Sequence, residues 1–518
     1  MSKCNGSNRK IMSRLLGSVC FAVVGGLADY AAADLNVMGS THGQSYQGVA
    51  QPATVNPPPG AAASIPLSLC DAGAPLPSRY QNAANLADPV DPTVIWPANT
   101  SIVWVCRRGG APFTFRYTGG FSARAYNAMR QPFGSPGSRM GTIVPGGTGC
   151  TAVAGNPQTD PGTGRQYNSF VGCNQLETVF ANFGTSDTRG TAFEPNMCDQ
   201  TGDCASPVAD SGIQSFPIVA VPFVMIVGNG VQKCNPNGTA GGKITLTRSQ
   251  VESIYSGQIT SWNQLGYCVF SAPDTNGDGF PDLNPIGTGS TAGIDQSIVT
   301  CSRPVNAGTR IVFNSTQMIN ASELTFGTIG GGSPYRTFAV PGETNYLAPT
   351  VSDGLTCVQG RTTPAPASPA NRGAITYQRA DEAANSANFG AGNVGRMNGG
   401  YPVELDGYLP HTYVPPANAI TPTDAERAAA QKDFRCGRVS FWADWVGIQR
   451  TSPVDANQQL WNQYVAGIAQ LLPRTTNGYF FARNLRQPGQ PVNSEMFVTK
   501  NATKGPIQWN PGNPTACR

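Results

Sequence analysis

The segment Asp274-Thr-Asn-Gly-Asp-Gly-Phe-Pro-Asp282 carries oxygen ligands at a spacing that suits a hard cation. Asp274, Asn276, Asp278 and Asp282 place carboxylate and amide oxygens close together in one short loop. Gly279 permits the sharp turn that such a loop needs, and Ca²⁺ takes six or more oxygen ligands of this kind. The sequence therefore predicts a structural calcium site formed by these four acidic and amide residues.

A solvated turn explains the same segment, because Asp, Asn and Gly are also the residues that turns prefer. The D-x-N-x-D-G-x-x-D spacing resembles that of calcium loops in dockerin-like and thrombospondin-type repeats. However, the twelfth position, where an EF-hand loop has a bidentate Glu, is Pro285. Both interpretations stay open, and a bound calcium ion would have modest affinity. Nothing else in the sequence calls for a cofactor.

Catalytic motifs are missing from the sequence. It contains no G-x-S-x-G and no H-E-x-x-H segment, and its two histidines are His42 and His411. His411 lies among loop residues with no Ser or Cys motif to pair with. The Gly-rich segment 287–293 lacks the Lys-Ser/Thr pair of a P-loop. We therefore expect a binding or structural protein and not an enzyme.

Composition indicates an exported, disulfide-bonded protein. Of the 14 cysteines, Cys4 and Cys20 precede Asp34, which leaves an even number for up to six disulfides. Cys198 and Cys204 flank a short polar loop and are expected to form a local bridge. Charged residues make up 12% of the chain and the formal net charge is only +4, so nucleic acid is not an expected partner.

The first 33 residues have the pattern of a signal peptide. Basic residues precede a short apolar core at 15–28, and Ala31-Ala32-Ala33 offer a cleavage site before Asp34. No later segment reaches the roughly 18 apolar residues of a membrane span. We expect a soluble mature chain in the periplasm or outside the cell.

Strand-like and helix-like segments alternate along the remainder, which favours an α/β fold. The expected strands are 102–106, 113–117, 218–227, 311–313 and 374–377, and the expected helices are 122–129, 174–182, 423–434 and 456–472. The mature length exceeds one compact core, so two lobes are expected.

The segment 246–265 is the most informative one for function. Thr247 is an expected N-cap with Gln250 at the capping-box position, and Gly257 is expected to end the helix, ahead of a Trp262-Asn263 pair. This arrangement resembles the second-lobe signature of periplasmic phosphate-binding proteins and their secreted DING-type relatives.

Further short motifs resemble this family in the same order along the chain. They are Gly39-Ser-Thr41 after the first strand, the Gly-Gly turn into a helix at 115–126, Asn182-Phe-Gly-Thr-Ser-Asp187, the crossing strand 216–225, Arg303-Pro-Val-Asn-Ala-Gly-Thr309 and Gly373-Ala-Ile-Thr-Tyr377. The resemblance implies a type-2 periplasmic-binding-protein fold. Lobe 1 would combine 34–220 with 436–518, and lobe 2 would span 221–435.

The resemblance also implies an anion site between the lobes, formed by Thr41, His42, Ser122, Asp187, Arg303, Gly308 and Thr309. Helix N-termini and hydroxyls would donate to the anion, and Arg303 would add a charge-assisted contact. Asp187 would accept the proton that phosphate keeps and sulfate lacks. The implied ligand is phosphate or a related tetrahedral oxyanion, with an ABC-transporter membrane component as the expected partner.

Departures from the family pattern leave a second function open. Ala307 replaces the family serine, Val305 replaces the acidic residue that would orient Arg303, and inserts occupy 43–100 and 130–172. Thr118 or Thr148 could supply the hydroxyl assigned to Ser122. The alternative is an extracellular structural, adhesion or secretion-associated protein that keeps the fold and has lost the ligand.

Overall fold

The fold is described from a computed structural model of the protein. The structure describes residues 34–40, 65–120, 122–160, 164–192, 212–238, 241–271, 291–303, 307–318, 345–348, 354, 357–358, 373–380, 400–408, 432–452, 457–475, 481–482, 496, 498–500 and 507–509. The expected signal peptide, the 198–204 bridge, the 274–282 loop and most of the expected helix 423–434 lie outside these residues.

Strands dominate the described residues. They are β1 Asp34–Ser40, β2 Ser78–Asn82, β3 Leu86–Ala87, β4 Ile95–Trp96, β5 Ser101–Arg108, β6 Ala111–Gly120, β7 Arg139–Ile143, β8 Thr151–Ala152, β9 Gln158–Thr159, β10 Gln166–Cys173, β11 Leu176–Phe180, β12 Phe183–Ser186, β13 Ile213–Gly228, β14 Val231–Lys233, β15 Thr245–Leu246, β16 Tyr267–Val269, β17 Val299–Ser302, β18 Asn345–Leu347, β19 Ala374–Arg379, β20 Gly400–Pro402, β21 Glu404–Leu405, β22 Trp442–Arg450, β23 Phe481–Ala482, β24 Val498–Lys500 and β25 Ile507–Trp509.

The main α-helices are α1 Ser122–Arg130, α2 Arg248–Tyr255, α3 Gly308–Thr316 and α7 Gln458–Thr475. Short 3-10 helices are η2 Ile65–Leu69, η3 Pro136–Ser138, η4 Gly190–Ala192 and η5 Trp262–Leu265. At the start of α2, the Thr247 hydroxyl accepts a hydrogen bond from the backbone N–H of Gln250, and the backbone N–H of Thr247 donates to Gln250 Oε1. The expected capping box is therefore confirmed, and Gly257 follows the helix with φ of +76°.

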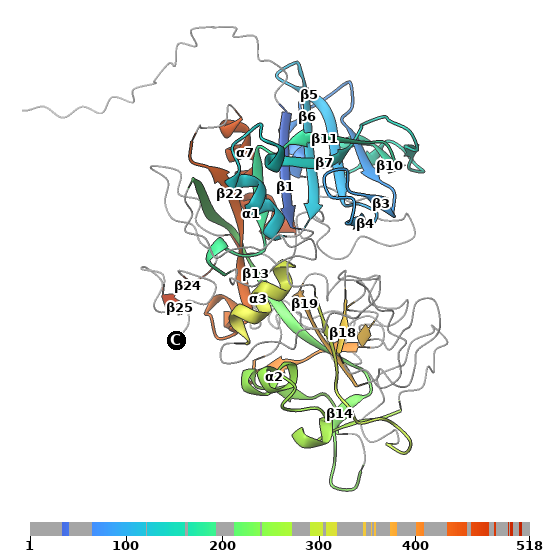
Figure 1. Cartoon of the computed structure of the whole chain (residues 1–518), viewed down its shortest axis with the longest axis vertical. Coiled ribbons are helices and arrows are strands. Elements are labelled where there is room, and N and C mark those ends of the chain that lie inside the picture. The colour runs from blue at the N-terminus through green and yellow to red at the C-terminus, as the bar shows by residue number, and fades with distance from the viewer. Residues whose placement is uncertain are drawn as a thin grey trace, which may run out of the picture.

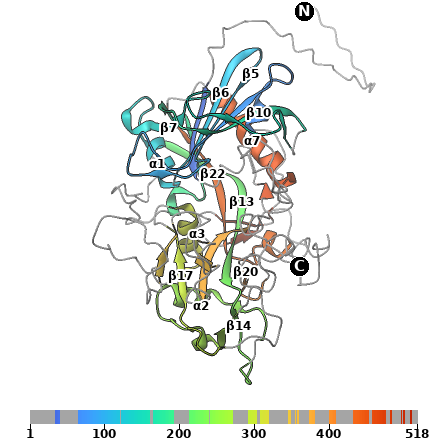
Figure 2. The same cartoon turned by 90° about the vertical axis from the view of Figure 1, so that its right-hand side faces the viewer.

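One long strand connects the two parts of the molecule that Figures 1 and 2 show. The first half of β13 pairs with β22, and its second half, Phe223–Val227, pairs with β19. The resulting sheet follows the order β18-β17-β19-β13-β22-β12-β1-β6-β5-β2-β10-β8. Helix α3 lies between the two parts in both views (Figures 1 and 2).

Strand directions place two sets of carboxyl ends opposite each other. β1, β6 and β12 are mutually parallel, and β17 is parallel to β19. Between the two sets, β22 and β13 are joined by antiparallel pairings throughout, so the second set runs opposite to the first. The carboxyl ends of both sets therefore point toward the middle of the molecule. In open α/β sheets, ligands bind beyond such strand ends.

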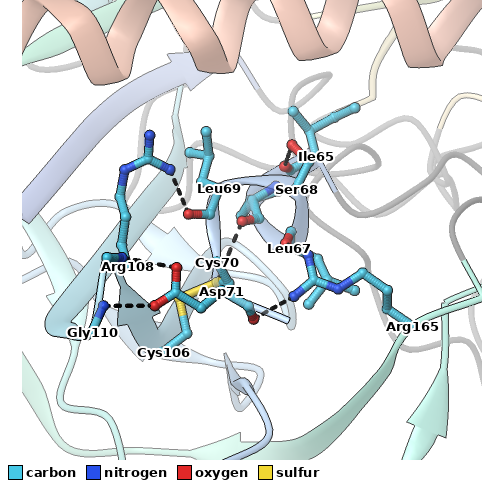
Figure 3. Close-up of a disulfide and its surroundings, with 12 residues drawn as sticks. Ile65, Leu67, Ser68, Leu69, Cys70, Asp71, Cys106, Arg108, Gly110 and Arg165 are labelled. Carbon is cyan, nitrogen blue, oxygen red and sulfur yellow. Dashed lines mark hydrogen bonds between the residues drawn. A yellow bond between two sulfur atoms is a disulfide. The ribbon is translucent and has the colours of Figure 1, made fainter. Parts of the chain in front are cut away.

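The inserts 43–100 and 130–172 extend the sheet as far as they are described. β2 pairs with β5 and with β10, and β8 closes that edge. A disulfide between Cys70 and Cys106 joins the insert to β5, as Figure 3 shows. Further disulfides join Cys150 to Cys173, Cys234 to Cys268 and Cys301 to Cys357.

Two predicted elements are wrong in type. The expected strand 311–313 lies inside α3, because a short run of buried apolar residues does not distinguish a strand from a buried helix. The expected helix 174–182 is instead strand β11, which pairs antiparallel with β7 from Leu176 to Phe180. Its Thr178-Val179-Phe180 segment is β-branched and aromatic, a composition that favours strands.

The other expected strands and helices agree with the structure where it is described. The strands 102–106, 113–117, 218–227 and 374–377 lie within β5, β6, β13 and β19, and the helices 122–129 and 456–472 correspond to α1 and α7. No described helix is both long and apolar enough to cross a membrane.

Candidate functional site

The carboxyl ends of β1, β6 and β12 bring three polar residues to one edge of the sheet. β1 ends at Ser40, β12 is followed by Asp187, and Ser122 begins α1 just beyond β6. All three side chains are buried, with at most 5% of their surface exposed. The Ser122 hydroxyl lies 3.4 Å from Asp187 Oδ2 and accepts the Asp187 amide proton at 3.2 Å. Ser122 and Asp187 thus form one unit.

The N-terminus of α3 packs directly against this unit. A Cβ added to Gly308 would lie 2.2 Å from Asp187 Oδ2 and 2.4 Å from Ser122 Oγ. Such distances exclude any side chain, so only glycine permits this approach. Because α3 follows β17, the contact joins the strand ends of the two parts of the molecule. The first backbone N–H groups of a helix carry partial positive charge and can bind an anion.

Arg303 follows β17 and is held by backbone groups. Its Nη1 donates to the Ala348 carbonyl at 2.8 Å, and its backbone N–H donates to the Tyr377 hydroxyl at 3.2 Å. The Arg303 carbonyl accepts from Arg310 Nη1 at 2.9 Å. The sequence shows no acidic residue two positions on to orient Arg303, and the Ala348 carbonyl contacts the guanidinium instead.

Arg379 is a further cationic residue of this region, and the sequence analysis missed it. It ends β19, beside the strand that precedes Arg303, and only 3% of its surface is exposed. Arg379 exerts the largest electrostatic effect of any charged group on Asp187, ahead of Arg303. The available signal was its place two residues beyond Tyr377, at the end of an apolar strand.

Burial raises the pKa of Asp187 above its ordinary value. The loss of hydration is the largest cause, and it outweighs the opposing effects of Arg379, the Ser40 and Ser122 hydroxyls, and Arg303. The protonation of Asp187 therefore depends on the balance between its burial and the neighbouring arginines and hydroxyls. Such perturbed groups concentrate at functional sites.

The side chain of Tyr117 holds the carboxyl end of β1 in place. Its hydroxyl donates to the Ser40 carbonyl at 2.7 Å and lies 3.0 Å from Thr185 Oγ1. A Cβ on Gly39 would lie 2.1 Å from both of these hydroxyl oxygens, so only glycine fits at this position of β1. Burial raises the pKa of Tyr117 well above its ordinary value, so the phenol stays neutral and can donate.

Of the other predicted anion-site residues, the structure describes one and leaves two outside the described part. Thr309 is in the first turn of α3 and is 6% exposed, next to Gly308. Thr41 and His42 lie outside the described residues. Of the alternatives to Ser122, Thr118 donates to the Gly141 carbonyl at 2.6 Å, and Thr148 is engaged with Asn174 at 2.7 Å. Of these three hydroxyls, that of Ser122 is the one that lies beside Asp187.

The predicted calcium ligands Asp274, Asn276, Asp278 and Asp282 lie outside the described residues. Within the described part of the chain, no group of three or more His, Cys, Asp or Glu side chains could hold a metal ion. The calcium loop stays a prediction.

The arrangement suits the capture of an anion. Two buried arginines and the N-termini of α1 and α3 provide positive charge, and hydroxyls provide neutral donors. A single carboxyl group, Asp187, can accept a hydrogen bond from a protonated ligand. We name Ser40, Ser122, Asp187, Arg303, Gly308 and Arg379 the strand-end cluster.

Comparison with solved structures returned phosphate-binding proteins. One is from Clostridium perfringens, assigned as a phosphate ABC transporter substrate-binding protein and solved with bound phosphate: 14% identity, 53% of this chain and 73% of that chain covered, TM-score 0.31. Another is an ABC-type phosphate transport receptor from Vibrio cholerae: 14% identity, 57% and 78% covered, TM-score 0.30.

A family model also matches part of the chain. Residues 172–417 match the PBP superfamily domain, a range that includes Asp187, Arg303, Gly308 and Arg379. No curated protein matched the chain. Together with the mixed α/β sheet, this match confirms the predicted type-2 periplasmic-binding-protein fold. Residues 172–417 of this chain are thus similar to the PBP superfamily domain.

Proposed function

We propose that this protein is an exported solute-binding protein that captures phosphate between two lobes. Lobe 1 would combine residues 34–220 with 436–518, and lobe 2 would span 221–435. One observation carries the proposal: the N-terminus of α3 at Gly308 meets Asp187 and Ser122 beyond the carboxyl ends of facing strands. The superfamily match supports a binding role, and phosphate is what several similar solved structures are named for.

Asp187 would select phosphate over sulfate. Phosphate near neutral pH keeps a proton that this carboxylate can accept, whereas sulfate would place two acceptors against each other. Arg303 would bind either anion, because its attraction does not depend on that proton. Transfer of the ligand to an ABC-transporter membrane component, and a periplasmic or secreted location, belong to the same proposal.

Calorimetry with inorganic phosphate and sulfate tests the function. We expect phosphate to bind at least tenfold tighter than sulfate, a difference of about 1.4 kcal/mol. Asp187→Asn should narrow the gap, since an amide can donate to sulfate. Arg303→Ala should weaken both anions. Equal affinity of the wild type for both anions would refute the selectivity.

A degenerate, structural protein is the second candidate, and Ala307 favours it. Ala307 occupies the N-cap of α3 and offers no side-chain hydrogen bond there. The family serine would have added a hydroxyl to the site. Absence of phosphate binding by the folded wild-type protein would support this candidate over the binder.

A further inference from the structure

We propose that Arg379 is a second cationic ligand-binding residue of the strand-end cluster, and that it makes the site prefer doubly charged tetrahedral oxyanions over singly charged ones. This inference rests on the proposed function, because it concerns the same bound anion. Arg379 would discriminate between ligands by their charge, whereas Asp187 would discriminate between them by the proton they carry.

The position of Arg379 follows from strand register. β17 and β19 are parallel, with Val299 opposite Ala374 and Cys301 opposite Thr376. Continuing this register brings the residues after β17 beside the last residues of β19. Arg303 and Arg379 therefore both lie at the carboxyl ends of neighbouring parallel strands, which is where open α/β sheets bind ligands.

The side chain of Arg379 leaves β19 on the face that α3 covers. Tyr377, two residues earlier, stacks on Phe313 of α3 with ring centroids 4.0 Å apart. Residues i and i+2 of a strand share one face of the sheet. The intervening Gln378 faces the other side, where its Nε2 lies 2.3 Å from the Cβ position of Gly354. Arg379 thus shares its face with the helix whose N-terminus, at Gly308, meets Asp187.

Charge in the strand-end cluster is unbalanced. Arg303 and Arg379 provide two guanidinium groups, and ionised Asp187 provides one negative charge against them. Arg310 adds a third guanidinium that donates to the Arg303 carbonyl. The attraction between charges scales with their product, so a dianion gains about twice as much from Arg379 as a monoanion does. Burial weakens the screening of this difference by water.

A purely structural role for Arg379 makes a different prediction. If Arg379 only neutralises Asp187 within the fold, its removal would lower the stability of the protein and affect all anions equally. The dependence of affinity on ligand charge therefore separates the two roles.

The test is calorimetric titration at about pH 8, where phosphate is mainly the dianion. The probes are inorganic phosphate and hypophosphite, a tetrahedral monoanion. The variants are Arg379→Gln, which removes the charge, and Arg379→Lys, which keeps the charge and loses the planar fork. Arg116→Gln is the matched control, since Arg116 is also a buried strand arginine but pairs with Asp34 and Glu177.

For Arg379→Gln we expect at least a tenfold loss of phosphate affinity and about a threefold loss for hypophosphite, as the charge product requires. Arg379→Lys should retain more phosphate affinity than Arg379→Gln. Arg116→Gln should bind both anions as the wild type does. Thermal unfolding identifies the variants that fold, and Arg379→Met, which also removes the charge, carries the test if Arg379→Gln does not fold.

Two outcomes would overturn the inference while leaving the proposed function intact. One is an unchanged phosphate affinity in Arg379→Gln, and the other is an equal loss for both anions. If the folded wild type binds neither anion, the proposed function fails first, and the inference fails with it.

Discussion

Asp187 and Asp71 are both carboxylates near strands of the main sheet, and their surroundings shift their pKa values in opposite directions. Asp71 lies at the surface, where it accepts the backbone N–H groups of Gly109 and Gly110, each at 2.8 Å. These two hydrogen bonds lower the pKa of Asp71. Asp187 is buried beside Ser122 and Gly308, and burial raises its pKa. Asp71, which binds the turn between β5 and β6, is thus favoured in its ionised form. For Asp187, burial favours the neutral form, and the nearby arginines and hydroxyls oppose this effect.

The surroundings of Asp71 serve the fold. Gly109 and Gly110 form the turn between β5 and β6, with φ of +58° and +80°. Figure 3 shows the neighbouring disulfide from Cys70 to Cys106 and the arginine side chains that donate to backbone carbonyls. Each group there has a fixed local partner. Around Asp187, by contrast, the groups come from five separate strand ends and their helices.

Removing the disulfide near Asp71 should cause the largest change in stability and leave binding intact. We expect the double variant Cys70→Ser with Cys106→Ser to lose about 3 kcal/mol of unfolding free energy, because the cross-link restricts the unfolded chain. Urea unfolding measures the loss. Calorimetry is the control, and a large loss of phosphate affinity in the folded double variant would contradict the separation of the two regions.

Adding a methyl group at Gly308 should cause the largest change in binding. Gly308→Ala places a Cβ against Asp187 and Ser122, and overpacking of this kind costs about 1–3 kcal/mol, or roughly fivefold to 150-fold if the whole cost falls on binding. Calorimetry with phosphate measures it. Gly120→Ala is the matched control at the same sheet edge, since the nearest atoms to its Cβ lie 3.9 Å away. Equal affinities of the two variants would count against the Gly308 contact.

Asp187→Asn should alter the pH dependence of stability in one direction. Because the folded pKa of Asp187 is raised, its contribution is present below the unfolded value of about 3.9 and is lost as pH rises through the folded pKa. The stability of the wild type relative to Asp187→Asn should therefore fall as pH increases above about 4. Urea unfolding at a series of pH values measures this, and a difference that grows with pH would be inconsistent with the buried carboxyl.

Asp71→Asn should give the smallest effect, with the opposite sign. The folded pKa of Asp71 is lowered, so its contribution is present above the unfolded value of about 3.9 and is lost as pH falls through the folded pKa. The advantage of the wild type over Asp71→Asn should shrink in acid. The same unfolding series measures both variants, and slopes of the same sign would remove the contrast between the two carboxylates.

Part of the candidate site could be predicted from sequence because it rests on local motifs. Asp187 ends the segment Asn182-Phe-Gly-Thr-Ser-Asp187, and Gly308 begins helix α3 within the segment 303–309. Arg379 could not be predicted in this way, because its relation to Asp187 depends on the pairing of β17 with β19 and on the packing of α3. Thr41, His42 and the calcium loop at 274–282 remain predictions.

The amino-acid sequence by itself determined the local elements of this protein. The capping box at Thr247 and Gln250, the apolar strand 218–227 and the helix after Ser122 depend on neighbouring residues, whose propensities and hydrogen bonds act within a few positions. The tertiary structure decided that 311–313 is helical, because a short buried apolar run fits either a strand or a helix. It also decided that Gly308 touches Asp187, because long-range packing overrides local preference and only the assembled sheet sets which strand ends meet.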